Sequence, residues 1–203
     1  MASITLPLDR FIPHPDVRER FETKIHAPAS FVMDVAANFD MQSPSVVRWI
    51  FWLRERFMGA SKAPRRKPQG LLAETQALGW SLLLENPGQW IVCGAACQPW
   101  KADVKFMPVP ADRFVSDAVP NHVKIAWSLE AEEVAPSITR FAQETRVIAT
   151  DAEAKTRFQA YWRWARFGIV SIRLLLLPAI RRTAEREWAR RSIEEQSSGR
   201  KRK

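Results

Sequence analysis

The feature that most constrains the fold of this chain is a helical pattern from Thr150 to Arg191. It opens with Thr150-Asp151-Ala152-Glu153, in which the Thr150 hydroxyl and the Glu153 carboxylate can each accept from the other's backbone N–H as a capping box. One face of this helix carries a long stripe of apolar side chains, which needs a broad apolar surface to cover. We expect the preceding chain to supply that surface as a curved antiparallel sheet. The stripe consists of apolar and small side chains at helical spacing: Phe158, Trp162, Ala165, Ile169, Ile172, Leu176 and Ile180.

Two residues interrupt this helix. Gly168 costs about 1 kcal/mol relative to alanine in a helix interior. Pro178 lacks a backbone donor and crowds the preceding turn, which predicts a bend near Leu174. The run Leu174–Leu177 is apolar on all sides, but it is bracketed by arginines and is shorter than the roughly 20 residues of a membrane span. We interpret it as a buried turn, and a homodimer interface is the alternative.

The net charge of +9 is confined to two segments. Basic residues cluster in a loop at 62–67 and in the C-terminal stretch 181–203, whereas the rest of the chain is neutral. Such runs are typical of solvated segments, and their position argues against a basic nucleic-acid face on the folded body. Contact of these segments with an anionic membrane or with nucleic acid stays open as a function.

The two cysteines, Cys93 and Cys97, fall on one expected strand. Four residues at about 3.3 Å each separate their Cα atoms by about 13 Å, which is too far for a disulfide. We therefore expect thiols and a reducing, cytoplasmic location. The N-terminus shows no basic segment followed by a long apolar run, so we expect no signal peptide.

The order of the remaining segments predicts one α+β domain at residues 18–191. An extended, proline-containing arm at 1–17 precedes it, and a disordered basic tail at 192–203 follows it. Residues 18–26 alternate as a half-buried strand, and the pairs Ala27-Pro28 and Ser43-Pro44 each begin a short helix. Residues 71–78 are ambiguous. Further strands are expected at Trp80–Glu85, Trp90–Gln98, Val104–Val109, Val123–Leu129 and Ile138–Ala149.

Several short sequence motifs accompany this order: Ala27-Pro28, Leu78-Gly79-Trp80, Glu85-x-Pro87-Gly88, Pro99-Trp100, Val123 to Trp127, Glu144-Thr145-Arg146-Val147 and Tyr161-Trp162. With them the chain resembles the START-like, polyketide cyclase-like (SRPBCC) superfamily of helix-grip proteins, and above all its uncharacterised bacterial members. The resemblance covers roughly residues 17–188. It implies a sheet wrapped around the C-terminal helix with a cavity between them, in which members bind lipids, hormones or aromatic polyketides and some catalyse cyclisation or dehydration. No catalytic motif of the family is present.

The polar candidates for chemistry are few. Glu144 and Arg146 lie two apart on one strand and therefore share a face. On the concave face they could orient a polar ligand group through the planar guanidinium, and on the outer face they would form an ordinary ion pair. Asp103 is a candidate general acid or base, with a turn-capping role as the alternative. The histidines His14, His26 and His122 have no partners at metal-ligand spacing, so we expect no metal and no cofactor.

Aromatic side chains could line a cavity, because they combine large apolar area with a polar edge. Plain core packing needs the same residue types and remains the alternative. The predicted ligand-binding set is Trp127, Phe141, Arg146, Phe158, Tyr161 and Trp162.

Three functions follow from these observations. The first is binding of a hydrophobic or aromatic small molecule between the sheet and the C-terminal helix. The second is a cyclase- or dehydratase-type enzyme that uses Asp103 or Glu144 for acid–base work in the same cavity. The third is an interaction module that contacts an anionic membrane or nucleic acid through its basic segments.

Overall fold

A computed structural model describes residues 6–39 and 70–200. The predicted second short helix, from Ser43-Pro44 to Gly59, and the basic loop 62–67 lie outside the described residues. The described elements, in chain order, are η1 (Pro7–Arg10), β1 (Val17–Ile25), α1 (Ala29–Ala37), α3 (Leu71–Ala77), β2 (Ser81–Asn86), β3 (Trp90–Cys97), β4 (Met107–Pro108), β5 (Val123–Ala135), β6 (Ile138–Ala149) and α4 (Ala152–Arg200).

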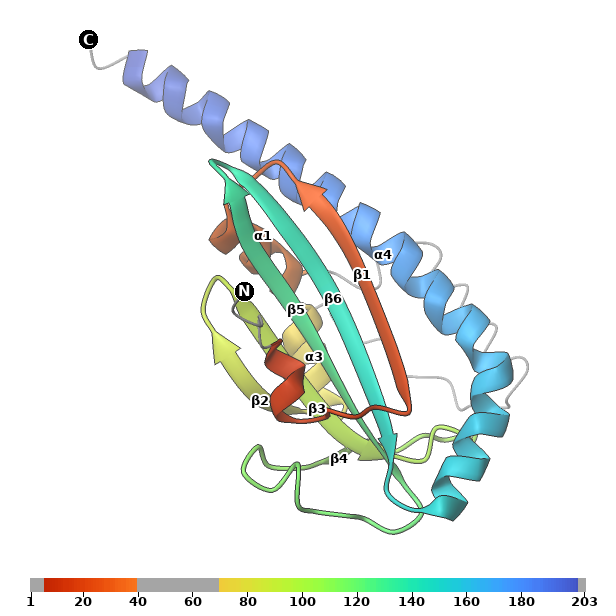
Figure 1. The fold of residues 1–203 in the computed structure, drawn as a ribbon. Coiled ribbons are helices and arrows are strands. Elements are labelled where there is room, and N and C mark those ends of the chain that lie inside the picture. Colours follow the sequence, from red (N-terminus) through yellow and green to blue (C-terminus); the bar gives the residue numbers. More distant parts are fainter. Residues whose placement is uncertain (1–5, 40–69, 201–203) are drawn as a thin grey trace.

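The strands form one antiparallel sheet of six strands with the order β1-β6-β5-β3-β2, and the short β4 pairs with β3. β1 pairs with β6 from Val17 opposite Val147 to Ile25 opposite Thr139, so the first and the last described strands are neighbours in the sheet. A long C-terminal helix accompanies this curved sheet (Figure 1). The prediction of an α+β helix-grip arrangement is confirmed.

The two faces of the sheet have different neighbours. The helix face carries odd-numbered side chains of β1, β5 and β6, such as Ile25, Leu129 and Phe141, which pack with α1 and α4 in the main core. The arm face carries the even-numbered side chains of the same strands. It is covered by the N-terminal segment and by the segment that follows β4, through a second cluster that includes Phe11 and Phe114. Figure 1 shows η1 and α1 on opposite sides of the strands.

The predicted extended arm at 1–17 is in part a 3-10 helix. Pro7 begins η1, and its fixed φ suits the first turn of a helix. Leu8, Phe11 and Ile12 are buried against the arm face. The arm is therefore part of the fold, because its apolar residues between the prolines have a surface to cover.

Gly94 makes close packing on the arm face possible. A Cβ at this position would lie 2.5 Å from Leu83 Cδ1 and 2.5 Å from Phe114 Cε2. Only a residue without a side chain lets the Phe114 ring rest on the sheet at this point.

The predicted strand Val104–Val109 is shorter in the structure, where it is reduced to Met107–Pro108, since Pro108 and Pro110 cannot donate to a strand neighbour.

The start of α4 corrects the predicted capping box by one residue. Asp151 is the cap, because its Oδ1 accepts from the Ala154 N–H at 2.7 Å. Thr150 Oγ1 instead donates to the His122 carbonyl at 2.8 Å and joins the helix start to β5. The helix starts in the predicted place, but its cap is the aspartate.

The end of α4 also differs from the prediction. The helix contains Pro178 and continues to Arg200, so residues 192–200 are helical where a disordered tail was expected. Figure 1 shows that α4 changes direction along its length and that its C-terminal part projects past the sheet. Within the described residues, no helix has both the length and the apolar character that a membrane crossing would need.

Candidate ligand-binding cavity

A cavity of about 420 Å³ lies between the helix face of the sheet and the N-terminal half of α4, with α3 and the β3–β4 segment at its side. Its volume falls within the range of small-molecule sites, about 300–1,000 Å³. Its walls are mostly apolar. The aromatic residues that line it are Trp80, Phe106, Trp127, Phe158, Tyr161 and Trp162.

The aromatic side chains form two groups on different walls. Phe158, Tyr161 and Trp162 are three and four residues apart on α4, so they share one helix face. The Phe158 and Trp162 rings stack with 5.7 Å between centroids. On another wall Trp80 contacts Phe106, with 4.9 Å between ring centroids, and Trp127 at 6.5 Å. Within each group the ring contacts hold the aromatic side chains in place.

A small polar patch interrupts the apolar wall. Glu19 of β1 lies opposite Thr145 of β6 in the strand register, and Gln143 is two residues before Thr145 on the same face. The Gln143 Nε2 group donates to Thr145 Oγ1 at 2.8 Å and to the Glu144 carbonyl at 3.0 Å. Gln143 Oε1 is buried and has no hydrogen-bond partner within the described residues.

Four of the six predicted binding residues line this cavity: Trp127, Phe158, Tyr161 and Trp162. Phe141 shares their face but lies in the main core, where it is fully buried and does not line the cavity. Arg146 lies on the opposite face, because an even-numbered residue of β6 points away from α4. Of the predicted set, therefore, only the aromatic residues of α4 and β5 come together here.

The two predicted acid–base residues do not line the cavity either. Asp103 is exposed in the segment after β3, and Glu144 lies beside Arg146 on the arm face. Among the described residues, the carboxylate that lines the cavity is that of Glu19. Of the carboxylates in the described part of the chain, Glu19 is the one placed for acid–base work in this cavity. The alternation of β1 contains the signal, since Glu19 has the same parity as Phe21 and Ile25 on the apolar face.

Glu144 and Arg146 form an ion pair on the face away from α4, as the second sequence interpretation expected, but the pair is buried and not exposed. Glu144 is 0% exposed and Arg146 is 1% exposed. The Glu144 carboxylate accepts from Arg146 Nε at 2.6 Å, from Arg18 Nε at 2.8 Å and from Arg20 Nη1 at 2.9 Å. Burial by itself would raise the pKa of Glu144, but the hydrogen bonds from the three guanidiniums lower it below its ordinary value. A carboxyl held in its ionised form is a poor proton donor at neutral pH.

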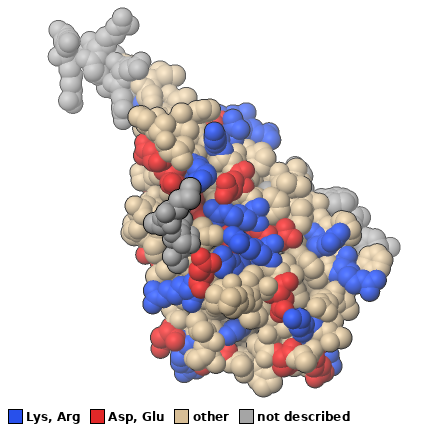
Figure 2. Space-filling model, in the orientation of Figure 1, with Lys and Arg blue, Asp and Glu red and all other residues tan. Residues whose placement is uncertain are grey.

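The same cluster fastens the N-terminal arm. Arg146 Nη1 bonds the Asp9 carboxylate at 2.7 Å and the Ile12 carbonyl at 2.8 Å. Arg20 also bonds Glu130, at 2.9 Å. Figure 2 shows acidic and basic side chains intermixed on the face of the molecule in view. We conclude that this cluster has a structural role, because every charged group in it has a partner.

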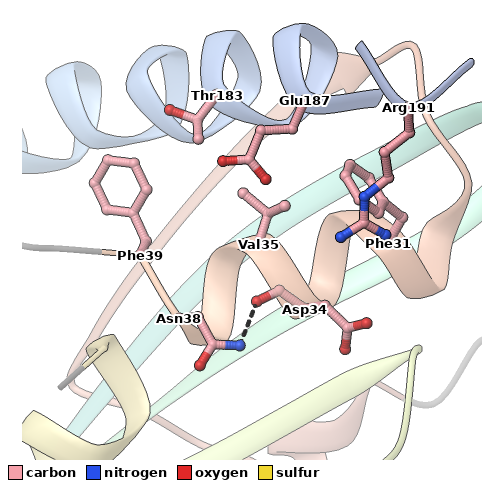
Figure 3. Close-up of a pocket in the computed structure, with 8 residues that line it drawn as sticks. All are labelled: Phe31, Asp34, Val35, Asn38, Phe39, Thr183, Glu187 and Arg191. Atoms are coloured by element: carbon pink, nitrogen blue, oxygen red, sulfur yellow. Dashed lines mark hydrogen bonds between the residues drawn. The ribbon is translucent and has the colours of Figure 1, made fainter. Parts of the chain in front are cut away.

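A second pocket, of about 400 Å³, lies between α1 and the C-terminal half of α4. Figure 3 shows Thr183, Glu187 and Arg191 of α4 facing α1 across it. The Arg191 guanidinium lies over the Phe31 ring at 4.7 Å from its centroid. This pocket is lined by both acidic and basic side chains, so it suits an apolar ligand less well than the first cavity.

Metal and thiol chemistry find little support in the described part of the chain. No cluster of three or more His, Cys, Asp and Glu side chains there is arranged to hold a metal ion. Cys93 and Cys97 are buried on β3, and no disulfide joins them, as predicted. Burial, and to a lesser degree the charge of Glu85, raises the pKa of Cys93 to about 12, so this thiol is not an activated nucleophile.

Comparisons with known proteins give distant structural likeness only. No protein-family model and no curated protein sequence matches this chain. The hypothetical protein jhp0584 from Helicobacter pylori is similar over 91% of this chain and 97% of its own, with 7% identity and a TM-score of 0.42. CalU16 from Micromonospora echinospora is similar over 85% of each chain, with 12% identity and a TM-score of 0.30.

A third solved structure, Ara h 8.0201, is similar over 77% of this chain and 93% of its own, with 8% identity and a TM-score of 0.22. At such low TM-scores and identities, we draw nothing about function from these three proteins.

Proposed function

We propose that this protein binds an apolar or aromatic small molecule in the cavity between the helix face and α4, as a distant member of the START-like (SRPBCC) superfamily. The observation that carries the proposal is the cavity of about 420 Å³ with aromatic groups on separate walls. Trp127, Phe158, Tyr161 and Trp162 contact the ligand. Binding is driven by the apolar area that the ligand and these rings remove from water.

Filling the cavity tests this proposal. Ile125 lines the cavity and is half-buried, so Ile125→Phe places a ring where the ligand would lie. We expect the affinity for the neutral dye N-phenyl-1-naphthylamine, followed by fluorescence titration, to fall at least about tenfold. Val134→Phe is the matched control, because Val134 is exposed near the β5–β6 turn. Absence of dye binding to the wild-type protein, or equal binding by both variants, would contradict the proposal.

A second candidate function is attachment to an anionic membrane surface, and one feature of α4 favours it. Trp164 and Phe167 are 79% and 63% exposed, although large apolar side chains usually avoid water. Residues 154–184 contain Lys and Arg but no Asp or Glu, and the Arg166 guanidinium lies over the Phe167 ring. Apolar side chains beside basic ones are typical of helices that lie in a bilayer interface.

Vesicle co-sedimentation tests this attachment. We expect binding to vesicles of phosphatidylcholine with phosphatidylglycerol and much weaker binding to phosphatidylcholine alone. The double variant Trp164→Ala/Phe167→Ala should lose at least about tenfold in affinity. A double variant at exposed valines elsewhere, Val115→Ala/Val134→Ala, serves as the control. Equal binding to both vesicle types would rule out an electrostatic contribution.

A further inference from the structure

Gln143, a residue that lines the cavity, has one buried acceptor that the fold leaves unused. Gln143 is 7% exposed and lines the cavity. Its Oε1 has no hydrogen-bond partner among the described residues. Buried side-chain oxygens almost always have a hydrogen-bond partner, since leaving that hydrogen bond unmade costs free energy. A buried acceptor without a partner, on a residue that lines the cavity, therefore marks a place where a bound molecule can supply the donor when the side chain turns toward it.

The neighbouring backbone determines which end of the Gln143 amide is unused. Nε2 lies 3.0 Å from the Glu144 carbonyl oxygen, which can only accept a hydrogen bond. Exchanging the two amide atoms would place Oε1 against that carbonyl and lose the bond. The bond from Nε2 to Thr145 Oγ1, at 2.8 Å, is compatible with this orientation. The atom left to the ligand is consequently an oxygen, and it calls for an O–H or N–H group.

The charge of the wall adds a second restriction. Glu19 lies on the helix face opposite Thr145 and lines the same cavity. The described residues that line the cavity include no Lys, Arg or His. A ligand carboxylate would be buried without a counter-charge and beside an acidic side chain, which is costly. A hydroxyl or amine meets no such penalty.

Resting on the ligand-binding function proposed above, we propose that the cavity selects apolar molecules that carry a hydrogen-bond donor, a hydroxyl or an amine, which donates to Gln143 Oε1. The cavity discriminates against the corresponding carboxylates through Glu19 and the lack of a lining cation. This selection separates the site from one for free fatty acids or other anionic lipids. The aromatic walls bind the apolar body, and Gln143 orients its polar end.

Three naphthalenes of similar size test the selection by displacing N-phenyl-1-naphthylamine from the wild-type protein at pH 7. The compounds are 2-naphthol, 2-methylnaphthalene and 2-naphthoate. We expect 2-naphthol to bind at least about tenfold more tightly than 2-methylnaphthalene, because only the former satisfies the buried oxygen. 2-Naphthoate should bind more weakly than both.

Two variants assign the effect to residues. Gln143→Met keeps a similar shape without the acceptor, so 2-naphthol should lose its advantage while 2-methylnaphthalene binds as before. Gln159→Met, an exposed glutamine of α4, is the control and should change nothing. Glu19→Gln should strengthen 2-naphthoate binding.

The outcomes separate the two proposals. If neither the dye nor any of the three compounds binds, the ligand-binding function itself fails. If all three compounds bind with equal affinity, ligand binding stands and the selection by Gln143 and Glu19 is overturned. The wild-type series decides the second point even if Gln143→Met does not fold.

Discussion

The two faces of the sheet carry polar side chains in opposite ways. On the arm face, Glu144 and Arg146 are buried with every charge paired. On the helix face, Gln143 and Thr145 alternate with them along the same strand, and Gln143 keeps one oxygen without a partner among the described residues. A saturated cluster stabilises a fixed arrangement, whereas an unsatisfied group on a cavity-lining residue is available to a ligand under the binding function proposed above. The charged residues that draw attention in the sequence are thus the structural ones, and an uncharged amide is the better functional candidate.

Breaking the arm-face cluster should have the largest effect. Glu144→Ala leaves Arg146 buried with only the Asp9 carboxylate and the Ile12 carbonyl as partners, and removal of one partner of a buried pair costs about 3–5 kcal/mol. We expect about 3 kcal/mol, because Arg18 is half exposed and Arg20 keeps Glu22 and Glu130. Urea unfolding measures the loss.

Glu132→Ala is the control for this substitution. It breaks an exposed pair with Arg140 and should cost at most about 1 kcal/mol. Equal costs for the two variants would mean that the buried cluster does not stabilise the fold.

Acid should reduce the stability that the arm-face cluster around Glu144 contributes. The pKa of Glu144 lies below its ordinary value of 4.5 in the folded protein. Its stabilising contribution is therefore complete above pH 4.5 and is lost as the pH falls through the lowered folded-state pKa. Glu144→Gln should be less stable than the wild type at pH 7 and should lose less stability on acidification, as followed by urea unfolding at several pH values. An unchanged pH dependence would show that other carboxyls dominate acid unfolding.

One substitution at two glycines compares packed and open positions. Gly94→Ala places a methyl group against Leu83 and Phe114, and such overpacking costs about 1–3 kcal/mol. Gly168→Ala meets no atom within 4 Å on α4 and should stabilise the helix by about 1 kcal/mol. Thermal unfolding should move in opposite directions for the two variants. Dye binding should survive in Gly168→Ala, since Gly168 does not line the cavity.

The smallest effect concerns the two thiols of the helix face. Cys97 lines the cavity, whereas Cys93 belongs to the main core. Both side chains are fully buried and should react slowly, but a small apolar maleimide should modify Cys97 before Cys93, and a saturating concentration of 2-naphthol should slow that reaction. Cys93, whose pKa is raised to about 12, should react only on unfolding. Peptide mass mapping over time distinguishes the two sites, and faster labelling of Cys93 would place the cavity elsewhere.

Much of the fold could be predicted from local patterns. The alternation of residues 138–149 predicted β6 with its bounds, and the apolar stripe predicted the long helix. Periodicity is a strong signal because one buried face of a regular element imposes it on the sequence. The end of α4 could not be predicted in this way, since the polar residues after Arg191 are compatible with either a solvated helix or a tail.

The candidate site also was predictable from the sequence only in part. The sequence by itself determined that Glu144 and Arg146 share one face of β6 and that Phe158 and Trp162 share one face of α4. Only the tertiary structure decided which face of β6 meets α4, because that depends on the pairing of β1 with β6 and on the arm that covers the other side. Strand alternation relates side chains to each other but does not say what covers them. The unused oxygen of Gln143 becomes visible only when its surroundings are assembled from residues far apart in the chain.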